Sequence, residues 1–259
     1  MSAAAIHPTA LVDPAARLGA GVAVGPGAII DANVRIGDGT RVGAYALLTG
    51  WLTIGSECRI HHGAVLGSPP QDLKYPGLES YLTVGDRTEI REYVTANLAT
   101  EPGETTRIGS DCLLMAYCHV AHNTQIGDHV VIANSVQMAG YVTVEDWAIV
   151  GGGSLVHQFT RIGRHAMVGG GSRVAQDVAP FVKAAGSPPR LAGINSIGLQ
   201  RRGFPTAAIQ ALERAYRLLF RDGLTVEQAV ARMRERSPDV AEVEQLAHFV
   251  ETSARGITR

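Results

Sequence analysis

The sequence predicts an all-β fold, a parallel β-helix built from hexapeptide repeats, followed by a C-terminal α-helical subdomain. Three observations lead to this prediction. An aliphatic residue recurs at every sixth position through most of the chain up to Val174. The position four residues later is usually small, and the repeat stops after Pro180, where apolar spacing typical of helices begins. A period of six fits neither a helix nor a plain alternating strand, whereas it fits short strands joined by sharp turns.

The hexapeptide repeat has two long stretches. The first has an aliphatic residue at every sixth position, at Ile6, Val12, Leu18, Val24, Ile30, Ile36, Val42, Leu48, Ile54, Ile60 and Leu66. The repeat returns at Val84 and Ile90, weakens at Ala96, and then continues at Ile108, Leu114, Val120, Ile126, Ile132, Met138, Val144, Val150, Val156, Ile162, Val168 and Val174. Each inward aliphatic contributes roughly 1.5–3 kcal/mol on burial, and we expect successive coils to share one core.

The interruptions of the repeat define loops and a domain boundary. We predict a β-helix domain over residues 1–190 and a helical domain over residues 191–259. Prolines and charged residues near 67–83 and 97–107 indicate loops that leave the coil. Loops that project from a rigid scaffold often provide ligand contacts.

The last quarter of the chain has the apolar spacing of helices. We expect three of them, at residues 206–221, 225–236 and 238–253. Thr225 and Gln228 form a capping-box pair at the start of the second. Ser237 followed by Pro238 predicts the start of the third, since proline is favoured at the first helical position.

Composition narrows the range of functions. The net charge of -1 provides no electrostatic reason to expect a nucleic acid or a membrane surface as a partner. No apolar run approaches the roughly 20 residues of a membrane span, so we expect none. The first residues, MSAAAIHPTA, lack the features of a secretion signal, which predicts a cytoplasmic protein. The three cysteines all occupy the small position of the hexad and are interpreted as buried rather than reactive: Cys58, Cys112 and Cys118.

A cluster of polar residues is expected on one side of the coil. Because three hexads make one turn, residues 18 apart should stack about 4.8 Å apart. His122 therefore lies beneath Gly140, which lies beneath Gln158, with His119 and His157 close by. An imidazole can accept a hydroxyl proton near neutral pH, and the N–H of a glycine can stabilise an oxyanion. The alternative is that these histidines are solvated turn residues.

We do not expect a metal site. Trimeric zinc carbonic anhydrases resemble this fold, but they place two ligand histidines five residues apart. Here His119 and His122 are three apart, and no third histidine stands at a suitable spacing.

A repeated glycine motif predicts a binding channel. VGGGS at 150–154 recurs as VGGGS at 168–172, so that the glycines stack. Glycines are often required by turn geometry, but three in a row on two coils exceed that need. We expect a smooth channel along the coil axis, running from His122 past Gln158. Gly170 is the preferred floor of this channel, with Gly152 or Gly171 as the alternatives.

Longer motifs identify a family. The stretches GSPPQDLKY (67–75), HVAHNTQIGDHVVIAN (119–134), VGGGSLVHQF (150–159) and INSIGLQRRGF (194–204) closely resemble the acyl-carrier-protein:UDP-N-acetylglucosamine O-acyltransferases. These enzymes perform the first step of lipid A synthesis. The resemblance covers almost the whole chain, and it implies a left-handed coil and a homotrimer with substrates bound between subunits. The partners that it implies are acyl-carrier protein and UDP-N-acetylglucosamine, with no cofactor and no metal.

The resemblance also implies roles for individual residues. His122 would be the general base on the glucosamine 3-hydroxyl, which attacks a (3-hydroxy)acyl thioester, and the Gly140 N–H would stabilise the oxyanion. Substrate contacts would come from Asp72, Lys74, His119, His157, Gln158, Asn195, Arg201 and Arg202. If the channel inferred from the repeated glycine motif holds the acyl chain, Gly170 or Gly152 would set the length of that chain.

The sequence departs from the family pattern beside the base. Many relatives have aspartate after the catalytic histidine, whereas Asn123 stands here. An asparagine can accept a hydrogen bond but offers no charge, so the group that assists His122 is left open. Two other functions stay open as well: the related N-acyltransferase of the same pathway, and a non-catalytic hexapeptide scaffold that binds nucleotide sugars. The former usually has an extra N-terminal domain, whereas hexads here begin at Ile6.

Overall fold

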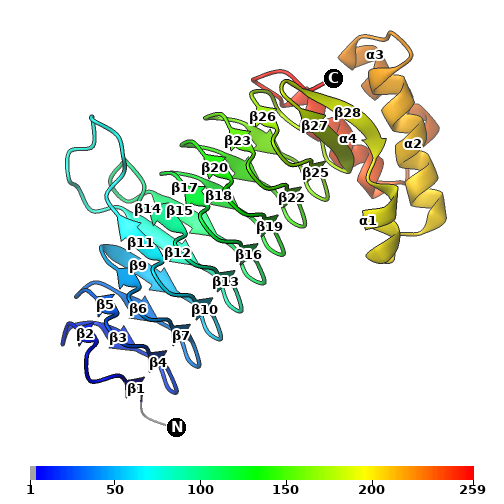
Figure 1. The fold of residues 1–259 in the computed structure, drawn as a ribbon. Coiled ribbons are helices and arrows are strands. Elements are labelled where there is room, and N and C mark those ends of the chain that lie inside the picture. Colours follow the sequence, from blue (N-terminus) through cyan, green and yellow to red (C-terminus); the bar gives the residue numbers. More distant parts are fainter. Residues whose placement is uncertain (1–3) are drawn as a thin grey trace.

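The chain folds into a left-handed parallel β-helix with three flat faces, and the helices stand at its C-terminal end (Figure 1). The structure is a computed structural model that describes residues 4–259. Consecutive strands from β1 to β26 belong to sheets A, B and C in turn. The turns between them form three edges, which we name the AB, BC and CA corners after the sheets that they join. The predicted fold class is confirmed.

Nearly all strands are two to four residues long. Sheet A contains β1 (Ala5–Ile6), β4 (Ala23–Val24), β7 (Arg41–Val42), β10 (Arg59–Ile60), β13 (Glu89–Ile90), β16 (Leu113–Leu114), β19 (Val131–Ile132), β22 (Ile149–Val150), β25 (Met167–Val168), β27 (Val182–Gly186) and β28 (Pro189–Ile194). Sheet B contains β2 (Leu11–Val12), β5 (Ile29–Ile30), β8 (Leu47–Leu48), β11 (Val65–Ser68), β14 (Thr95–Asn97), β17 (His119–Val120), β20 (Gln137–Met138), β23 (Leu155–Val156) and β26 (Arg173–Val174). Sheet C contains β3 (Arg17–Leu18), β6 (Arg35–Ile36), β9 (Trp51–Ile54), β12 (Tyr81–Val84), β15 (Thr105–Ile108), β18 (Gln125–Ile126), β21 (Thr143–Val144) and β24 (Arg161–Ile162).

Strand register confirms that residues 18 apart stack, as Ile6 and Val24 do. The sequence spacing between stacked residues becomes longer than 18 where the two loops leave the coil. Trp51 pairs with Tyr81, and Tyr81 pairs with Thr105, so the loops add two hexads and one hexad. The loops occupy residues 69–80 and 98–104, which is shorter than expected because the flanking strands extend into the expected ranges. In Figure 1 the first loop projects from the coil beside β11 and β12.

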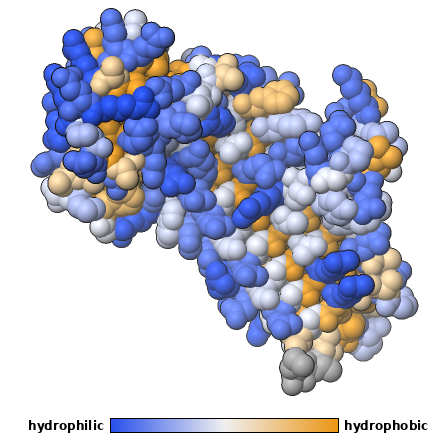
Figure 2. Space-filling model, turned by 180° about the vertical axis from the view of Figure 1, so that it is seen from behind, coloured by the Kyte–Doolittle hydropathy of each residue, from blue (hydrophilic) through white to orange (hydrophobic). Residues whose placement is uncertain are grey.

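The inward aliphatics form one continuous core. They are buried from Val24 onward, while Ile6 in the first described coil is 46% exposed. Figure 2 shows apolar side chains at the surface near that N-terminal end. The small position is buried as well. Burial raises the pKa of the Cys112 and Cys118 thiols to about 11 and raises that of Cys58, so all three remain protonated at neutral pH.

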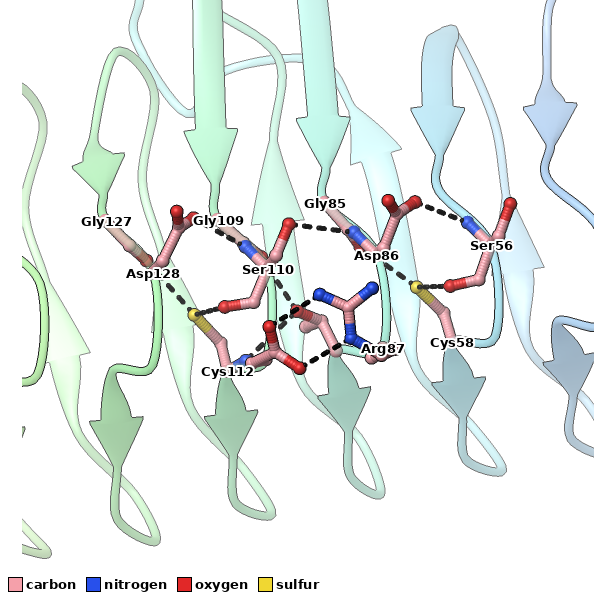
Figure 3. A network of polar contacts seen from close by, with 12 residues as sticks. Ser56, Cys58, Gly85, Asp86, Arg87, Gly109, Ser110, Cys112, Gly127 and Asp128 are labelled. Carbon is pink, nitrogen blue, oxygen red and sulfur yellow. Dashed lines mark hydrogen bonds and ion pairs between the residues drawn. The ribbon is translucent and has the colours of Figure 1, made fainter.

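Glycine often follows the inward aliphatic because the backbones of stacked coils approach closely at the CA corner. A Cβ on Gly85 would lie 2.6 Å from the Ser110 nitrogen. Side chains at this corner bind the turn of the preceding coil, and Figure 3 shows the resulting ladder. The Ser110 hydroxyl accepts from the Asp86 N–H (3.1 Å), and the Asp128 carboxylate accepts from the Ser110 N–H (2.8 Å). Between Ser56 and Asp128 this corner is therefore occupied by structural contacts.

The C-terminal region closes the coil. β27 and β28 form an antiparallel hairpin that extends sheet A as far as Ile194, so residues 191–194 lie in this hairpin rather than in a helix. Four helices follow: α1 (Ser196–Arg201), α2 (Thr206–Phe220), α3 (Val226–Arg236) and α4 (Ala241–Glu251). No helix within residues 4–259 is long and apolar enough to cross a membrane.

The helix predictions are confirmed in part. The capping box of Thr225 and Gln228 is present at α3. The expected start of the last helix at Pro238 is wrong. Ser237 ends α3 instead, donating its N–H to the Met233 carbonyl, and the chain makes a turn through Pro238 before α4 begins at Ala241. The short helix α1 was not predicted.

Candidate active site

The BC corner brings together the stack expected from the 18-residue spacing. The Tyr141 N–H donates to the His122 carbonyl (3.0 Å), and the Phe159 N–H donates to the Gly140 carbonyl (3.2 Å). His122, Gly140 and Gln158 therefore occupy equivalent places in three successive coils. The imidazole lies directly over Gly140, because a Cβ built on Gly140 would be 2.6 Å from Nε2. Glycine is needed here so that the imidazole has room, a steric reason that the sequence argument missed.

The Asn123 side chain orients His122. Its Oδ1 accepts from the Thr100 N–H (3.0 Å) and the Thr100 hydroxyl (2.9 Å), and it lies 2.9 Å from His122 Nδ1. A backbone N–H can only donate, so the amide atom facing Thr100 is the oxygen. The imidazole must then carry its proton on Nδ1. Nε2 is left free of hydrogen bonds within the described residues, as a general base requires.

The second loop, residues 98–104, holds Asn123 in place. Besides Thr100, this loop supplies Glu104, whose carboxylate accepts from Asn123 Nδ2. The Asn123 N–H donates to the Thr106 hydroxyl in β15 (2.8 Å), and the side chain of Asn123 is buried. Neither Thr100 nor Glu104 was predicted as a site residue, since the only signal was the break in the repeat.

Two aromatic rings line the same corner. The Tyr141 ring meets His122 edge to face, with ring centroids 5.4 Å apart. Phe159 stacks on Tyr141 from the next coil at 5.0 Å. The Tyr141 hydroxyl lies 3.1 Å from the Thr100 hydroxyl, whose own proton goes to Asn123. Tyr141 therefore donates to Thr100 and links the loop to the corner.

His119 lies on β17, beside the corner. Its Nδ1 is 2.7 Å from the Thr95 hydroxyl in the preceding coil. Burial, and secondarily the neighbouring His122, lowers the pKa of His119. It is therefore uncharged at neutral pH and can take part in hydrogen bonding to a ligand.

His157 and Gln158 lie on the exposed side of the stack. His157 Nδ1 donates to the Gln158 carbonyl (3.0 Å). Next to them a shallow groove of about 300 Å³ lies over β20, β23 and β26, with Leu155 and Arg173 among its lining residues. This groove occupies the outer face of sheet B and starts at the BC corner.

The two glycines predicted to limit an acyl chain lie at the opposite edge of sheet B. Gly152 and Gly170 stand in adjacent turns of the AB corner, before β23 and β26. The expected route along the coil axis past Gln158 is therefore wrong, because Gln158 belongs to the BC corner. A chain that starts at His122 and ends at Gly170 has to cross sheet B, where the groove lies.

Backbone geometry does not explain these two glycines. Gly153 and Gly171 have a positive φ of 67°, and a Cβ on Gly151 would lie 2.8 Å from the Val168 carbonyl oxygen. Gly152 and Gly170 have neither constraint: their added Cβ atoms would meet one carbonyl oxygen each at 3.1 Å. Other coils carry side chains at the same turn position, among them Ala44, His62, Glu92, Ala116 and Asn134.

Asp72 and Lys74 lie in the first loop, which leaves the coil at the BC corner between β11 and β12. The Asp72 carboxylate accepts from the Lys74 N–H (2.9 Å), which shapes the loop, and the Lys74 side chain is exposed.

Asn195, Arg201 and Arg202 lie near the CA corner, on a different edge from His122. Asn195 is buried, precedes α1 and donates to the His165 carbonyl (3.0 Å). Arg202 lies over the Trp147 ring at 5.1 Å and donates to His165 Nδ1 (3.1 Å). Arg201 is exposed at the end of α1. Within one chain these residues do not reach the BC corner.

His165 makes stability depend on pH. Burial, then the charges of Arg202 and Arg164, lowers its pKa to about 4, from an ordinary value of 6.5. The folded state therefore favours the neutral ring. The contribution of the neutral His165 ring to the free energy of unfolding is complete above pH 6.5 and is lost as the pH falls towards 4, an effect of roughly 2–3 kcal/mol.

A His165→Gln variant tests this pH dependence. In urea unfolding at pH 7.5 and pH 4.5, we expect His165→Gln to lose less stability on acidification than the parent. Equal losses would contradict this role.

Comparisons with known proteins agree with these features. The family model of UDP-N-acetylglucosamine O-acyltransferase domain 2 matches residues 177–258, and the bacterial transferase hexapeptide model matches 15–50, 33–68 and 105–140. The acyl-[acyl-carrier-protein]–UDP-N-acetylglucosamine O-acyltransferase of Janthinobacterium sp. (strain Marseille) is 47% identical over 259 residues, covering 98% of this chain and 99% of that protein. The chain belongs to the UDP-N-acetylglucosamine O-acyltransferase family.

Further relatives have the same length and shape. The corresponding enzyme of Thiobacillus denitrificans is 47% identical over 257 residues, covering 99% of this chain and 100% of that one. The crystal structure of LpxA, a UDP-N-acetylglucosamine acyltransferase of Bacteroides fragilis, superposes with a TM-score of 0.95 at 40% identity, covering 98% of this chain and 99% of that one. LpxA of Acinetobacter baumannii also superposes with a TM-score of 0.95, at 41% identity and with the same coverage.

The residues that the structure describes contain no group of three or more His, Cys, Asp or Glu side chains arranged to hold a metal ion. The His119 and His122 pair instead has hydroxyl and amide partners, Thr95 and Asn123.

Proposed function

We propose that the chain transfers a (3-hydroxy)acyl group from acyl-carrier protein to the 3-hydroxyl of UDP-N-acetylglucosamine, the first step of lipid A synthesis. One observation supports this most strongly. In a chain of this family, the imidazole of His122 is held by Asn123 with Nε2 free, directly over a glycine of the next coil. This geometry suits a base that removes a proton from a hydroxyl group.

The reaction follows from that arrangement. Nε2 of His122 takes the proton of the sugar 3-hydroxyl while the oxygen attacks the thioester carbonyl. The carbonyl oxygen becomes an oxyanion, and the Gly140 N–H, which has no acceptor among residues 4–259, is our candidate to stabilise it. When the intermediate collapses, the C–S bond breaks and the imidazolium returns its proton to the leaving thiolate.

We assign the remaining predicted residues to substrate binding. Neutral His119 and the exposed Gln158 and His157 border the same corner and suit the hydroxyl and amide groups of the sugar. Asp72 and Lys74 would approach from the first loop. Arg201 and Arg202 suit a diphosphate, which two guanidinium groups can bind at several oxygens.

We further propose that the active unit is a homotrimer. Arg201, Arg202 and Asn195 lie at the CA corner, whereas His122 lies at the BC corner of the same chain. A neighbouring copy would bring its CA corner to this BC corner and supply the second wall of a cleft. Sedimentation equilibrium should give three times the 27.4 kDa chain mass. A monomer that transfers acyl groups at full rate would contradict the shared site.

A transfer assay tests the proposed reaction. Purified chain is incubated with UDP-N-acetylglucosamine and acyl-carrier protein loaded with chains of different lengths, with and without a 3-hydroxyl. We expect an ester product with at least one donor, identified by mass and by the position of the acyl group. Transfer to an amine acceptor alone would favour the N-acyltransferase, and no transfer with any donor would favour a binding scaffold.

A further inference from the structure

We propose that Glu104 is a positioning residue for His122, acting through the Asn123 amide. The chain then supplies, from the second loop, the negative charge that an aspartate in direct contact with the base would otherwise provide. This inference rests on the proposed function, because it assigns Glu104 a part in the same proton transfer.

The contacts of Asn123 set the direction of the relay. Thr100 identifies the amide oxygen, so His122 Nδ1–H donates to Oδ1 at 2.9 Å. The amide nitrogen on the other side then donates to the Glu104 carboxylate. Hydrogen bonds in such a chain polarise one another, so the carboxylate makes Oδ1 a better acceptor. The imidazolium formed during catalysis is stabilised as a result.

Glu104 keeps its charge available for this role. Within residues 4–259, no arginine, lysine or histidine forms an ion pair with Glu104. The groups that face His122 are the neutral His119, the Tyr141 ring and Asn123. None of these three side chains is a carboxylate. Within the described residues, Glu104 is therefore a carboxylate that hydrogen bonds through Asn123 connect to the base.

The relay also explains why aspartate would fit poorly at position 123. An aspartate could accept from Thr100 and His122 as Asn123 does. Its second oxygen, however, would face the Glu104 carboxylate with no proton between them, and two adjacent carboxylates repel each other. Asparagine at 123 and glutamate at 104 therefore form a matched pair. Moving the carboxylate to 123 and the amide to 104 should preserve the hydrogen bond between the two side chains.

A charge exchange tests the pair. The variants are Glu104→Gln, Asn123→Asp and the double variant Asn123→Asp/Glu104→Gln. We expect kcat of Glu104→Gln to fall about tenfold at neutral pH with KM for UDP-N-acetylglucosamine nearly unchanged, since a missing charge weakens the base rather than binding. The acidic limb of its pH–rate profile should move to lower pH. We expect Asn123→Asp alone to lose more activity than Glu104→Gln.

The double variant carries the decisive result. The side-chain amide that Glu104→Gln introduces can donate to the second oxygen of the new aspartate, so we expect kcat to recover to within a few-fold of the parent. Its acidic limb should move to higher pH than in the parent, because the charge now touches the imidazole. A double variant no better than the poorer single variant, or a Glu104→Gln variant with the parent's kcat and pH profile, would overturn the proposal.

Glu101→Gln is the matched control. Glu101 lies in the same loop, is exposed, and its carboxylate accepts no hydrogen bond within the described part of the chain. Removing its charge should leave the pH profile unchanged.

A measurement without substrate separates this inference from the proposed function. The 15N shifts of the His122 ring report which nitrogen carries the proton in the free protein. We expect Nδ1–H in the parent, whether or not transfer is observed. A neutral ring protonated at Nε2 would overturn the relay, while an Nδ1–H ring in a chain that transfers no acyl group would overturn only the proposed reaction.

Discussion

Replacing His122 with alanine should lower kcat/KM by about 10²–10⁴, the usual effect of losing a general base. The imidazole sits on the outer edge of the BC corner and contributes nothing to the aliphatic core, so the fold should persist. The alanine removes both the free Nε2 and the hydrogen bond to Asn123, while Gly140 becomes uncovered. Steady-state kinetics with saturating acyl donor measures the loss, and sedimentation of the variant checks that assembly is unchanged.

His7→Ala is the control for this prediction. His7 lies in the first coil, is exposed, and its side chain forms hydrogen bonds only with Thr9 within the described residues. Its replacement should leave kcat/KM within about twofold of the parent, as surface substitutions usually have small effects. If His122→Ala retains activity close to that of the parent, His122 is not the base.

Replacing Gly170 with methionine should change the preferred length of the acyl chain. Gly170 is exposed at the AB corner, and its φ does not demand glycine, so a side chain fits with only a small shift of the Gly152 carbonyl oxygen. Methionine then occupies the space of about three methylenes, each worth roughly 0.8 kcal/mol on burial. We expect long donors to lose on the order of a hundredfold in kcat/KM, while short donors are little affected.

The measurement is kcat/KM across a series of acyl lengths for parent and variant. Asn134→Met is the matched control, because Asn134 occupies the same turn position two coils earlier and already carries a side chain. It should leave the length preference unchanged. An equal loss for long and short donors in Gly170→Met would mean that Gly170 does not limit the chain.

The sequence was enough to predict the coil, because each face of the prism needs one inward aliphatic residue and little else. The 18-residue repeat then placed His122 beneath Gly140 without any knowledge of loops. The same repeat also puts Gly170 on a different corner from the base, because Gly170 lies 48 residues, or eight hexads, after His122, which is not a whole number of three-hexad turns. The expected route past Gln158 conflicts with that spacing, and the strand order places Gly170 at the AB corner and His122 at the BC corner.

The contacts of Asn123 could not be predicted from the sequence. Thr100 and Glu104 lie in a loop that interrupts the repeat, and no periodicity determines where such a loop returns to the coil. The start of α4 was misplaced for a related reason. Ser237 and Pro238 fit a helix start locally, but the end of α3 already uses Ser237, so the next helix begins later.

A crystal structure with bound UDP-N-acetylglucosamine tests the central claim most directly. We expect the sugar 3-hydroxyl oxygen to lie within hydrogen-bond reach of His122 Nε2, about 2.6–3.2 Å, while Nδ1 keeps its contact with Asn123. A guanidinium group from a neighbouring copy should contact the diphosphate. A nucleotide sugar bound with its 3-hydroxyl away from His122 would contradict the assignment of this residue as the base.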